Sequence, residues 1–218
     1  MKTNNCLLTL ILTLLIMTTT TATAQNIALP TPQTTGGLSL AEALAHRHST
    51  REFDASRTLT PQQLSDLLWS AAGINRPEDG KRTNPTALNS QEIDLYVFDS
   101  NGVYLYDPKA NSLELKVADD HRALVAGNKA FSQEFVLEAP LSVVMIADLG
   151  RFERQDPRIA MMAAMDAGIV SENICLFCSA NGLATVPRAT MDGAAIISLL
   201  GLTDSHLPLL NNPVGFAR

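Results

Sequence analysis

The stretch from His46 to Phe53 reads His-Arg-His-Ser-Thr-Arg-Glu-Phe and follows a segment with a helical pattern. Cationic and hydroxyl side chains alternate here, and guanidinium forks together with hydroxyl groups suit phosphate oxygens. The stretch therefore predicts a local site for the tail of a phosphorylated cofactor. The structural alternative is a solvated helix end whose cations offset the negative end of the helix dipole, and this stretch alone leaves both open.

Signals for helices lie on both sides of this stretch. Ser39 and Glu42 have the spacing of a capping box and predict a first helix that ends near Arg47. A second capping box opens with Thr60 and predicts a helix that stops at Gly73. Both segments carry apolar residues at helical spacing, so each helix is expected to cover part of a larger core.

Farther along the chain, alternating apolar residues predict an antiparallel meander, and longer apolar runs predict a buried strand and further helices. The helix expected over 158–181 is apolar over much of its surface, which places it in a core or a dimer interface. Strands and helices do not alternate strictly, so we expect a single α+β domain. The expected strands are 93–97, 103–106, 113–117, 141–147 and 209–216, and the expected helices are 121–138, 158–181 and 193–200.

The N-terminal region is predicted to lie outside this domain. Residues 1–24 combine Lys2, an apolar run and small residues before the expected cleavage site, as a secretory signal peptide does. The apolar run is short for a membrane span, which needs about 20 residues, so no stable membrane insertion is expected after cleavage. Residues 25–37 are predicted to be an extended tether that is poorly ordered until it meets the fold, and 38–218 the folded domain. The protein is therefore expected to be exported, with the periplasm as the favoured destination.

The overall charge restricts the possible partners. The formal net charge is -6 and the isoelectric point is near 5.1, with no basic run outside the short cluster. A chain of this charge has no long-range attraction for nucleic acid or for an anionic membrane surface. Neither partner is expected, and any anion site must be local.

Two cysteines, Cys175 and Cys178, have the spacing of a thiol redox pair. They lie in the middle of a long apolar helical pattern, whereas a reactive thiolate gains from a helix N-terminus. Buried core thiols are therefore the favoured interpretation. With no second pair of cysteines and no histidine nearby, no metal site is expected.

Three segments that lie far apart follow known motifs in a known order. Arg47–Phe53 has the pattern Arg-x-Ser-x-Arg-x-Phe, and Asn84–Gln91 is similar to Pro-Ser-x-x-Asn-x-Gln. Asn181–Arg188 is similar to a segment that follows a long central helix, while 67–74 and 213–216 are similar to Leu-Leu-x-Ala-Ala and Val-Gly-Tyr-Pro. Together these motifs resemble the nitroreductase family of flavoproteins over most of residues 38–216.

The resemblance implies a nitroreductase-like α+β fold, a central and mostly antiparallel sheet flanked by helices, in a homodimer with FMN at the subunit interface. It implies ping-pong hydride transfer through flavin N5, from NAD(P)H or another small-molecule donor to a nitroaromatic or quinone-type acceptor. A flavin dehydrogenase of a peptide or small molecule is an alternative, because the meander at 103–117 looks like the branch with peptide azoline dehydrogenases. A non-catalytic member that binds flavin or another ligand is a further alternative.

The resemblance also assigns the site. No side chain is expected to be catalytic, because the cofactor carries the chemistry, and FMN is favoured over a dinucleotide because no Gly-x-Gly-x-x-Gly element is present. The implied cofactor-binding residues are Arg47, His48, Ser49, Arg51, Pro85, Thr86, Ala87, Asn89, Gln91, Gln133, Pro187, Ala189, Thr190 and Arg218.

Some of these residues have simple structural alternatives. Asn89 and Gln91 could cap the loop before a strand, Gln133 could be an ordinary polar surface residue, and a terminal Arg218 is usually solvated. The chain also departs from the family pattern, since Ala189 and Thr190 stand where many members have an acidic residue and then a glycine. That departure puts the selectivity for substrates over the flavin ring in doubt.

Overall fold

The strand predicted from the apolar run 141–147 forms the centre of the fold. The structure, a computed structural model, describes residues 26–153 and 156–218. In it β7 (Leu141–Asp148) is buried from Leu141 through Ala147 and pairs antiparallel with β4 (Ile93–Asp99) and β9 (His206–Gly215). A strand that is paired along both edges and covered on both faces has no polar face to present, which explains its continuous apolar sequence.

The sheet has seven strands in the order β1-β6-β5-β4-β7-β9-β8, and every pairing is antiparallel. The predicted meander is observed as β4, β5 and β6, joined by tight turns. A separate hairpin, β2–β3, follows the second helix. The remaining strands are β1 (Asn26–Ala28), β2 (Ile74–Arg76), β3 (Lys81–Arg82), β5 (Gly102–Asp107), β6 (Ser112–Ala118) and β8 (Ala184–Thr185).

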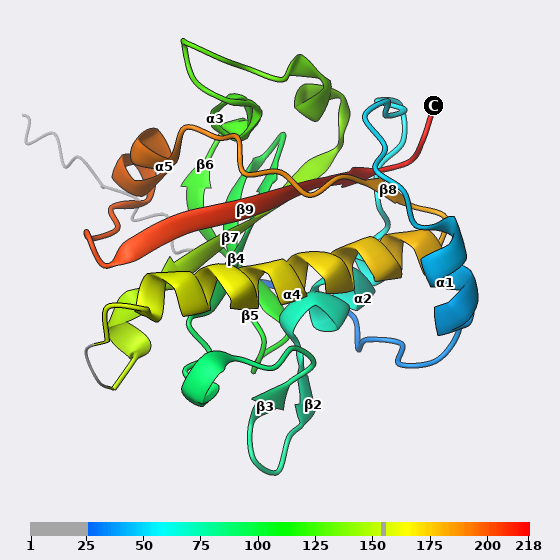
Figure 1. Cartoon of the computed structure of the whole chain (residues 1–218). Helices are drawn as coiled ribbons and strands as arrows, with labels where there is room; N and C mark the ends of the chain where they lie inside the picture. The colour runs from blue at the N-terminus through cyan, green and yellow to red at the C-terminus, as the bar shows by residue number, and fades with distance from the viewer. Residues whose placement is uncertain (1–25, 154–155) are drawn as a thin grey trace, which may run out of the picture.

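Helices cover both faces of the sheet (Figure 1). On one face α2 (Pro61–Ala72) and α4 (Ile159–Ala180) enclose the larger apolar cluster with alternate residues of β4 and β7. On the other face α3 (Arg122–Ala126) and α5 (Gly193–Leu200) enclose a second cluster with the intervening residues of the same strands. This is the predicted α+β arrangement, a central antiparallel sheet flanked by helices.

The longest helix, α4, is only partly covered by the chain itself. It packs against α2 and β9 on one side and against α1 (Leu40–His46), whose Ala43 carbonyl accepts a hydrogen bond from Ser179 Oγ at 2.7 Å. Met161 and Met165 on another side are 52% and 60% exposed. By length and composition α4 could cross a bilayer, as many core helices of soluble proteins could. Here it is a core helix with one exposed apolar side.

The single helix predicted over 121–138 is wrong. The structure has only the short α3, then a loop, and then the 3-10 turn η2 (Glu134–Glu138). Gly127 ends α3 with a φ of 154°, and a Cβ there would collide with the Phe131 carbonyl. The Asn128 carboxamide accepts two backbone N–H bonds within the following loop, which competes with helix continuation.

Most of the N-terminal tether lies within the described residues and meets the fold, whereas the predicted signal peptide, residues 1–24, lies outside them. Within 25–37, β1 adds an edge strand to β6, and the Leu29 amide donates to the Asn111 carbonyl at 3.1 Å. The Pro30 carbonyl accepts a bond from Asn111 Nδ2 at 2.8 Å. The partners of this segment lie more than 80 positions away in the chain, so local composition could not reveal the pairing.

Candidate functional site

The cationic segment after α1 is extended and anchored at two points. The backbone leaves the helix at Arg47, which is the C-cap of α1. The Thr50 amide donates to the carbonyl of Thr185 in β8 at 3.0 Å, and the Phe53 side chain is completely buried. These anchors fix the backbone, so the side chains between them can face a ligand without reorganising the chain.

Three donor side chains of this segment have no protein partner. Arg47, Ser49 and Arg51 form no side-chain hydrogen bond and no ion pair within residues 26–153 and 156–218. Ser49 and Arg51 line a cavity of about 350 Å³ together with Ala217 and Arg218. Cationic and hydroxyl donors on an anchored backbone, with no partner of their own, suit an anionic group. The residues present therefore fit a phosphate and the hydroxyl groups next to it.

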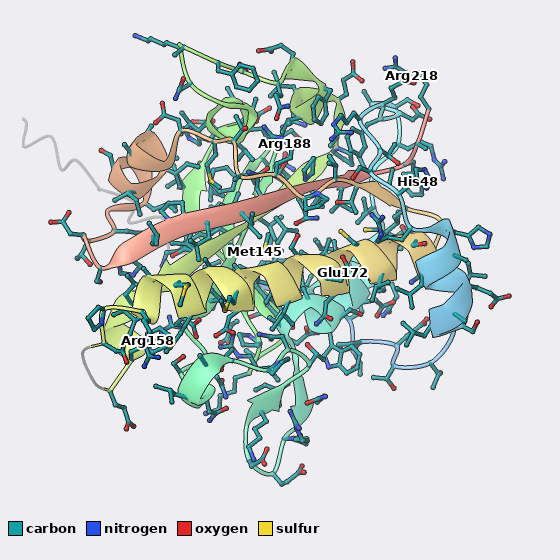
Figure 2. The ribbon with its side chains drawn as sticks, viewed as in Figure 1. His48, Met145, Arg158, Glu172, Arg188 and Arg218 are labelled. Carbon is teal, nitrogen blue, oxygen red and sulfur yellow. The ribbon has the colours of Figure 1, made fainter. Side chains whose placement is uncertain are left out.

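Two other predicted contacts at this end of the molecule are already engaged. Arg218 Nη2 lies 3.0 Å from Glu138 Oε2 and 3.3 Å from the Phe53 carbonyl. An exposed ion pair of this kind contributes little, so Arg218 can exchange it for a ligand. His48 Nδ1 lies 2.7 Å from the His46 carbonyl, which leaves Nε2 free. Figure 2 shows His48 and Arg218 at the end of the molecule where the chain terminates.

The loop 85–91 has an unusual backbone. It contains the 3-10 turn η1 (Ala87–Asn89), and Leu88, Asn89 and Gln91 have φ values of 56°, 54° and 49°. Residues other than glycine meet a steric penalty in this left-handed region, and such strain gathers at functional sites. The Asn89 side chain is exposed and has no partner in the described part of the chain. The strained loop therefore presents an uncommitted carboxamide.

The two groups of predicted contacts lie at different places along α4. The Ala87 amide donates to Asp166 Oδ2 at 2.7 Å, whereas His48 lines a small cavity with Cys178. Residues 166 and 178 are separated by a helical rise of about 18 Å. Figure 2 shows Arg158, near the start of α4, and His48 at opposite ends of this helix. A single chain therefore does not bring the loop 85–91 to the segment 47–51.

A buried arginine, which the sequence analysis did not assign to the site, organises the third segment. Arg188 is 6% exposed and donates to Gln133 Oε1 at 2.8 Å, to Asn211 Oδ1 at 2.6 Å and to the carbonyls of Val125 and Ala126. Burial lowers the pKa of Arg188 to about 10, so it stays cationic at neutral pH. Gln133 was predicted to contact a cofactor, but its side-chain oxygen accepts a hydrogen bond from Arg188. A charged residue in an otherwise apolar segment was the only sequence signal.

The residues around Arg188 are held against β9. Its backbone makes two hydrogen bonds with the backbone of Asn211, at 2.8 and 2.7 Å, and Asn211 Nδ2 donates to the Thr190 carbonyl at 3.0 Å. Pro187 and Ala189 are exposed. The amides of Ala189 and Thr190 donate to no residue in the described part of the chain. Two fixed N–H groups are thus left for a ligand.

The two cysteines of α4 are buried and free, as the favoured interpretation predicted. Burial raises the pKa of Cys175 to about 11 and raises the pKa of Cys178 well above its usual value. Thiolates are therefore disfavoured at neutral pH, and a thiol redox role loses its support.

The geometry defines an α+β protein with a prepared anion site, and comparison with known proteins identifies its family. A sequence profile described as the nitroreductase family matches residues 44–216. The chain therefore belongs to the nitroreductase family, a family of flavin-dependent oxidoreductases, as the ordered motifs predicted. Comparison with curated proteins gives no match.

Solved structures show the same fold. A nitroreductase-like protein of Ralstonia eutropha is 38% identical, with a TM-score of 0.81, over 88% of this chain and 90% of that chain. A second nitroreductase-like protein, from Anabaena variabilis, is 17% identical with a TM-score of 0.71, over 89% of this chain and 42% of that chain. The microcin synthetase complex McbBCD of E. coli gives 17% identity and a TM-score of 0.67, over 87% and 76%. The last two likenesses concern the fold alone.

Proposed function

We propose that this protein is an exported, FMN-dependent oxidoreductase that works as a homodimer on small-molecule donors and acceptors. The observation that carries this proposal is the set of donors at Arg47, Ser49 and Arg51, which have an anchored backbone and no side-chain partner among the described residues, in a segment with a motif of the family. FMN, when bound, would supply hydride transfer at N5, taken from NAD(P)H or another donor and given to a nitroaromatic or quinone in a ping-pong cycle. The proposal includes neither stable membrane insertion nor a nucleic acid partner.

The chain's own residues would bind and orient the cofactor. Arg47 and Arg51 neutralise phosphate charge, and Ser49 donates to a neighbouring oxygen. The free amides of Ala189 and Thr190 can hydrogen-bond to an acceptor atom of a flat ring, and Arg188 holds them in place through β9. This division is consistent with a family in which the cofactor carries the chemistry and the protein orients it.

A homodimer would unite the two groups of contacts that a single chain keeps apart. The uncovered side of α4 exposes Met161, Met165 and Ile169, and the neighbouring α1 exposes Leu40 and Leu44. Exposed apolar side chains on two helices favour burial against a second copy. The exposed Asn89 of one protomer would then complete the site of the other.

The electron donor is the point on which a second candidate differs. Reduced nicotinamides are normally cytoplasmic, so the predicted signal peptide favours a donor of another kind, and a flavin dehydrogenase of a peptide or small molecule is the second candidate. The same site residues would serve both reactions. Turnover of the purified protein with NADH and a quinone, compared with artificial donors, separates them.

The first test is the visible absorption spectrum of the mature protein, followed by identification of any cofactor released on denaturation. We expect a yellow protein that releases FMN, and weaker binding in Arg47→Ala. A colourless protein that also fails to take up added FMN would overturn the proposal. FMN binding without turnover with any donor would instead favour a non-catalytic member of the family.

A further inference from the structure

A second cavity, of about 930 Å³, lies away from the segment 47–51. It is formed between α2, the β2–β3 hairpin, the β5–β6 turn and the N-terminal segment, with no contribution from 47–51 or 187–190. Figure 1 shows the hairpin projecting on the side of α2 and α4. Cavities that bind small molecules have volumes of about 300–1,000 Å³, so this one is large enough for a small organic ligand.

Two polar side chains hold part of the wall of this cavity in place. The Thr31 carbonyl accepts a bond from Gln62 Nε2 at 3.0 Å, and Asn111 Nδ2 donates to the Pro30 carbonyl at 2.8 Å. These contacts tie the N-terminal segment to α2 and to the β5–β6 turn. The backbone that bounds this part of the cavity is therefore held in place by hydrogen bonds.

Arg82 supplies a partly buried cation to this cavity. Nε donates to Gln91 Oε1 at 3.1 Å and Nη1 donates to the Ile93 carbonyl at 3.2 Å, which uses two of the five guanidinium N–H groups. Arg82 forms no ion pair with any residue of 26–153 or 156–218. Burial lowers the pKa of Arg82, because the charge is partly removed from water. A guanidinium group that is held in place and keeps unused N–H donors suits a carboxylate.

The acidic residues around the cavity already have partners. Asp94 Oδ2 lies 2.6 Å from Arg151 Nη2, and Glu114 Oε1 lies 3.1 Å from Lys116 Nζ. Asp107 Oδ1 accepts two backbone N–H bonds in the β5–β6 turn. Each of these carboxylates bonds to another group and none forms an ion pair with Arg82, although Asp94 is close enough to attract its charge. The remaining guanidinium N–H groups are therefore available to a ligand carboxylate.

Flat apolar side chains face the same space. Trp69 and Tyr106 line the cavity together with Pro32 and Pro108. The Trp69 indole N–H is bound to the Ile74 carbonyl at 3.1 Å, so the ring is held in place. Aromatic and proline rings offer a bed for the body of a planar ligand, while a cation orients its charged end.

We propose that this cavity binds a small carboxylic acid with a flat, aromatic body, whose carboxylate is held by Arg82. This site is separate from the anion site at 47–51 and requires no flavin. Gln91 links the two, because its side chain bonds to Arg82 while its backbone belongs to the strained loop 85–91. Only this link to the flavin rests on the proposed function.

The test is fluorine NMR of the mature protein, as purified, with 4-fluorobenzoate and its neutral analogue 4-fluorobenzamide. We expect the acid to bind at least tenfold more tightly than the amide, and Arg82→Gln to remove that preference. Arg158→Gln, an exposed arginine outside the cavity, should bind the acid like the wild type. Circular dichroism of each variant reports whether it is folded.

The comparison of acid and amide on the wild type needs no variant, so a misfolded Arg82→Gln would leave the test intact. Equal binding of acid and amide, or no binding of either, would overturn the proposal. Displacement of 4-fluorobenzoate by FMN would also overturn it, because the cavity would then be part of the flavin site. A colourless protein that still prefers the acid would sink the oxidoreductase proposal and leave this one standing.

Discussion

Arg47 and Arg51 on one side, and Arg188 on the other, are the same residue type in opposite situations. The first two lie on an extended surface segment with no described partner, whereas Arg188 is buried and donates to four groups. A buried cation that satisfies its surroundings holds the fold together, and an exposed cation without a partner is available to a ligand. Partners and burial, more than residue type, thus separate a structural arginine from a binding arginine.

The largest effect on stability is expected when Arg188, the buried arginine, is replaced. Arg188→Met leaves the carbonyls of Val125 and Ala126 and the side chains of Gln133 and Asn211 without their donor. We expect a loss of about 3 kcal/mol in the free energy of unfolding, measured by urea denaturation. The matched variant Arg51→Met should stay within about 0.5 kcal/mol of the wild type. Equal losses in the two variants would contradict the distinction.

For ligand binding, we expect a large effect from replacing the exposed Arg51. Arg51→Met should weaken the binding of FMN by about 10- to 100-fold, because a charge-assisted hydrogen bond contributes roughly 1.5–3 kcal/mol. Isothermal titration of the apoprotein with FMN measures this. Lys129→Met, which replaces an exposed cation that does not line the cavity at Ser49 and Arg51, should bind FMN unchanged. Unaltered FMN affinity in Arg51→Met would remove that residue from the site.

The buried carboxylate of Glu92 extends the comparison, because its contribution to stability depends on pH. Glu92 is fully buried, Ser90 Oγ donates to its Oε2, and its Oε1 has no partner. Burial raises the pKa of Glu92 and Asp166 acts in the same direction, while Ser90 opposes the shift. Because the folded pKa lies above the unfolded value near 4.5, the stability due to the protonated form is complete below that pH. It is lost as the pH rises through the folded pKa.

We therefore expect wild-type protein to lose stability, relative to Glu92→Gln, as the pH rises from about 4.5 towards neutral. Urea denaturation at a series of pH values measures the difference. The exposed Glu78 provides the control, since Glu78→Gln should follow the wild-type pH dependence. Parallel curves for wild type and Glu92→Gln would show that Glu92 does not titrate differently on folding.

The smallest effect on the stability of a single chain is expected for a substitution on the exposed side of α4. Met165 is 60% exposed, so Met165→Glu should change the stability of a single chain by no more than about 0.5 kcal/mol. A charge at this position should nevertheless dissociate the proposed homodimer. Sedimentation equilibrium of wild type and variant measures the oligomeric state. A wild type that is monomeric at all concentrations would contradict the dimer.

Local signals predicted most of the secondary structure. Both capping boxes are present, with Ser39 and Thr60 accepting from the third residue of each helix, and the apolar run 141–147 is the central strand. The helix expected over 121–138 fails because Gly127 and an Asx turn outweigh the apolar pattern. The pairing of the N-terminal segment could not be predicted because its partners lie in β6 and α2.

The sequence by itself determined the family and predicted a binding segment, because motifs, caps and apolar runs consist of neighbouring residues whose chemistry can be read in order. Only the tertiary structure decided which cations are free. Arg188 receives its partners from Gln133, Asn211 and the end of α3, and Arg82 lacks a carboxylate because those nearby are paired elsewhere. Such pairing depends on distances between residues that are remote in the chain, and no local pattern contains them.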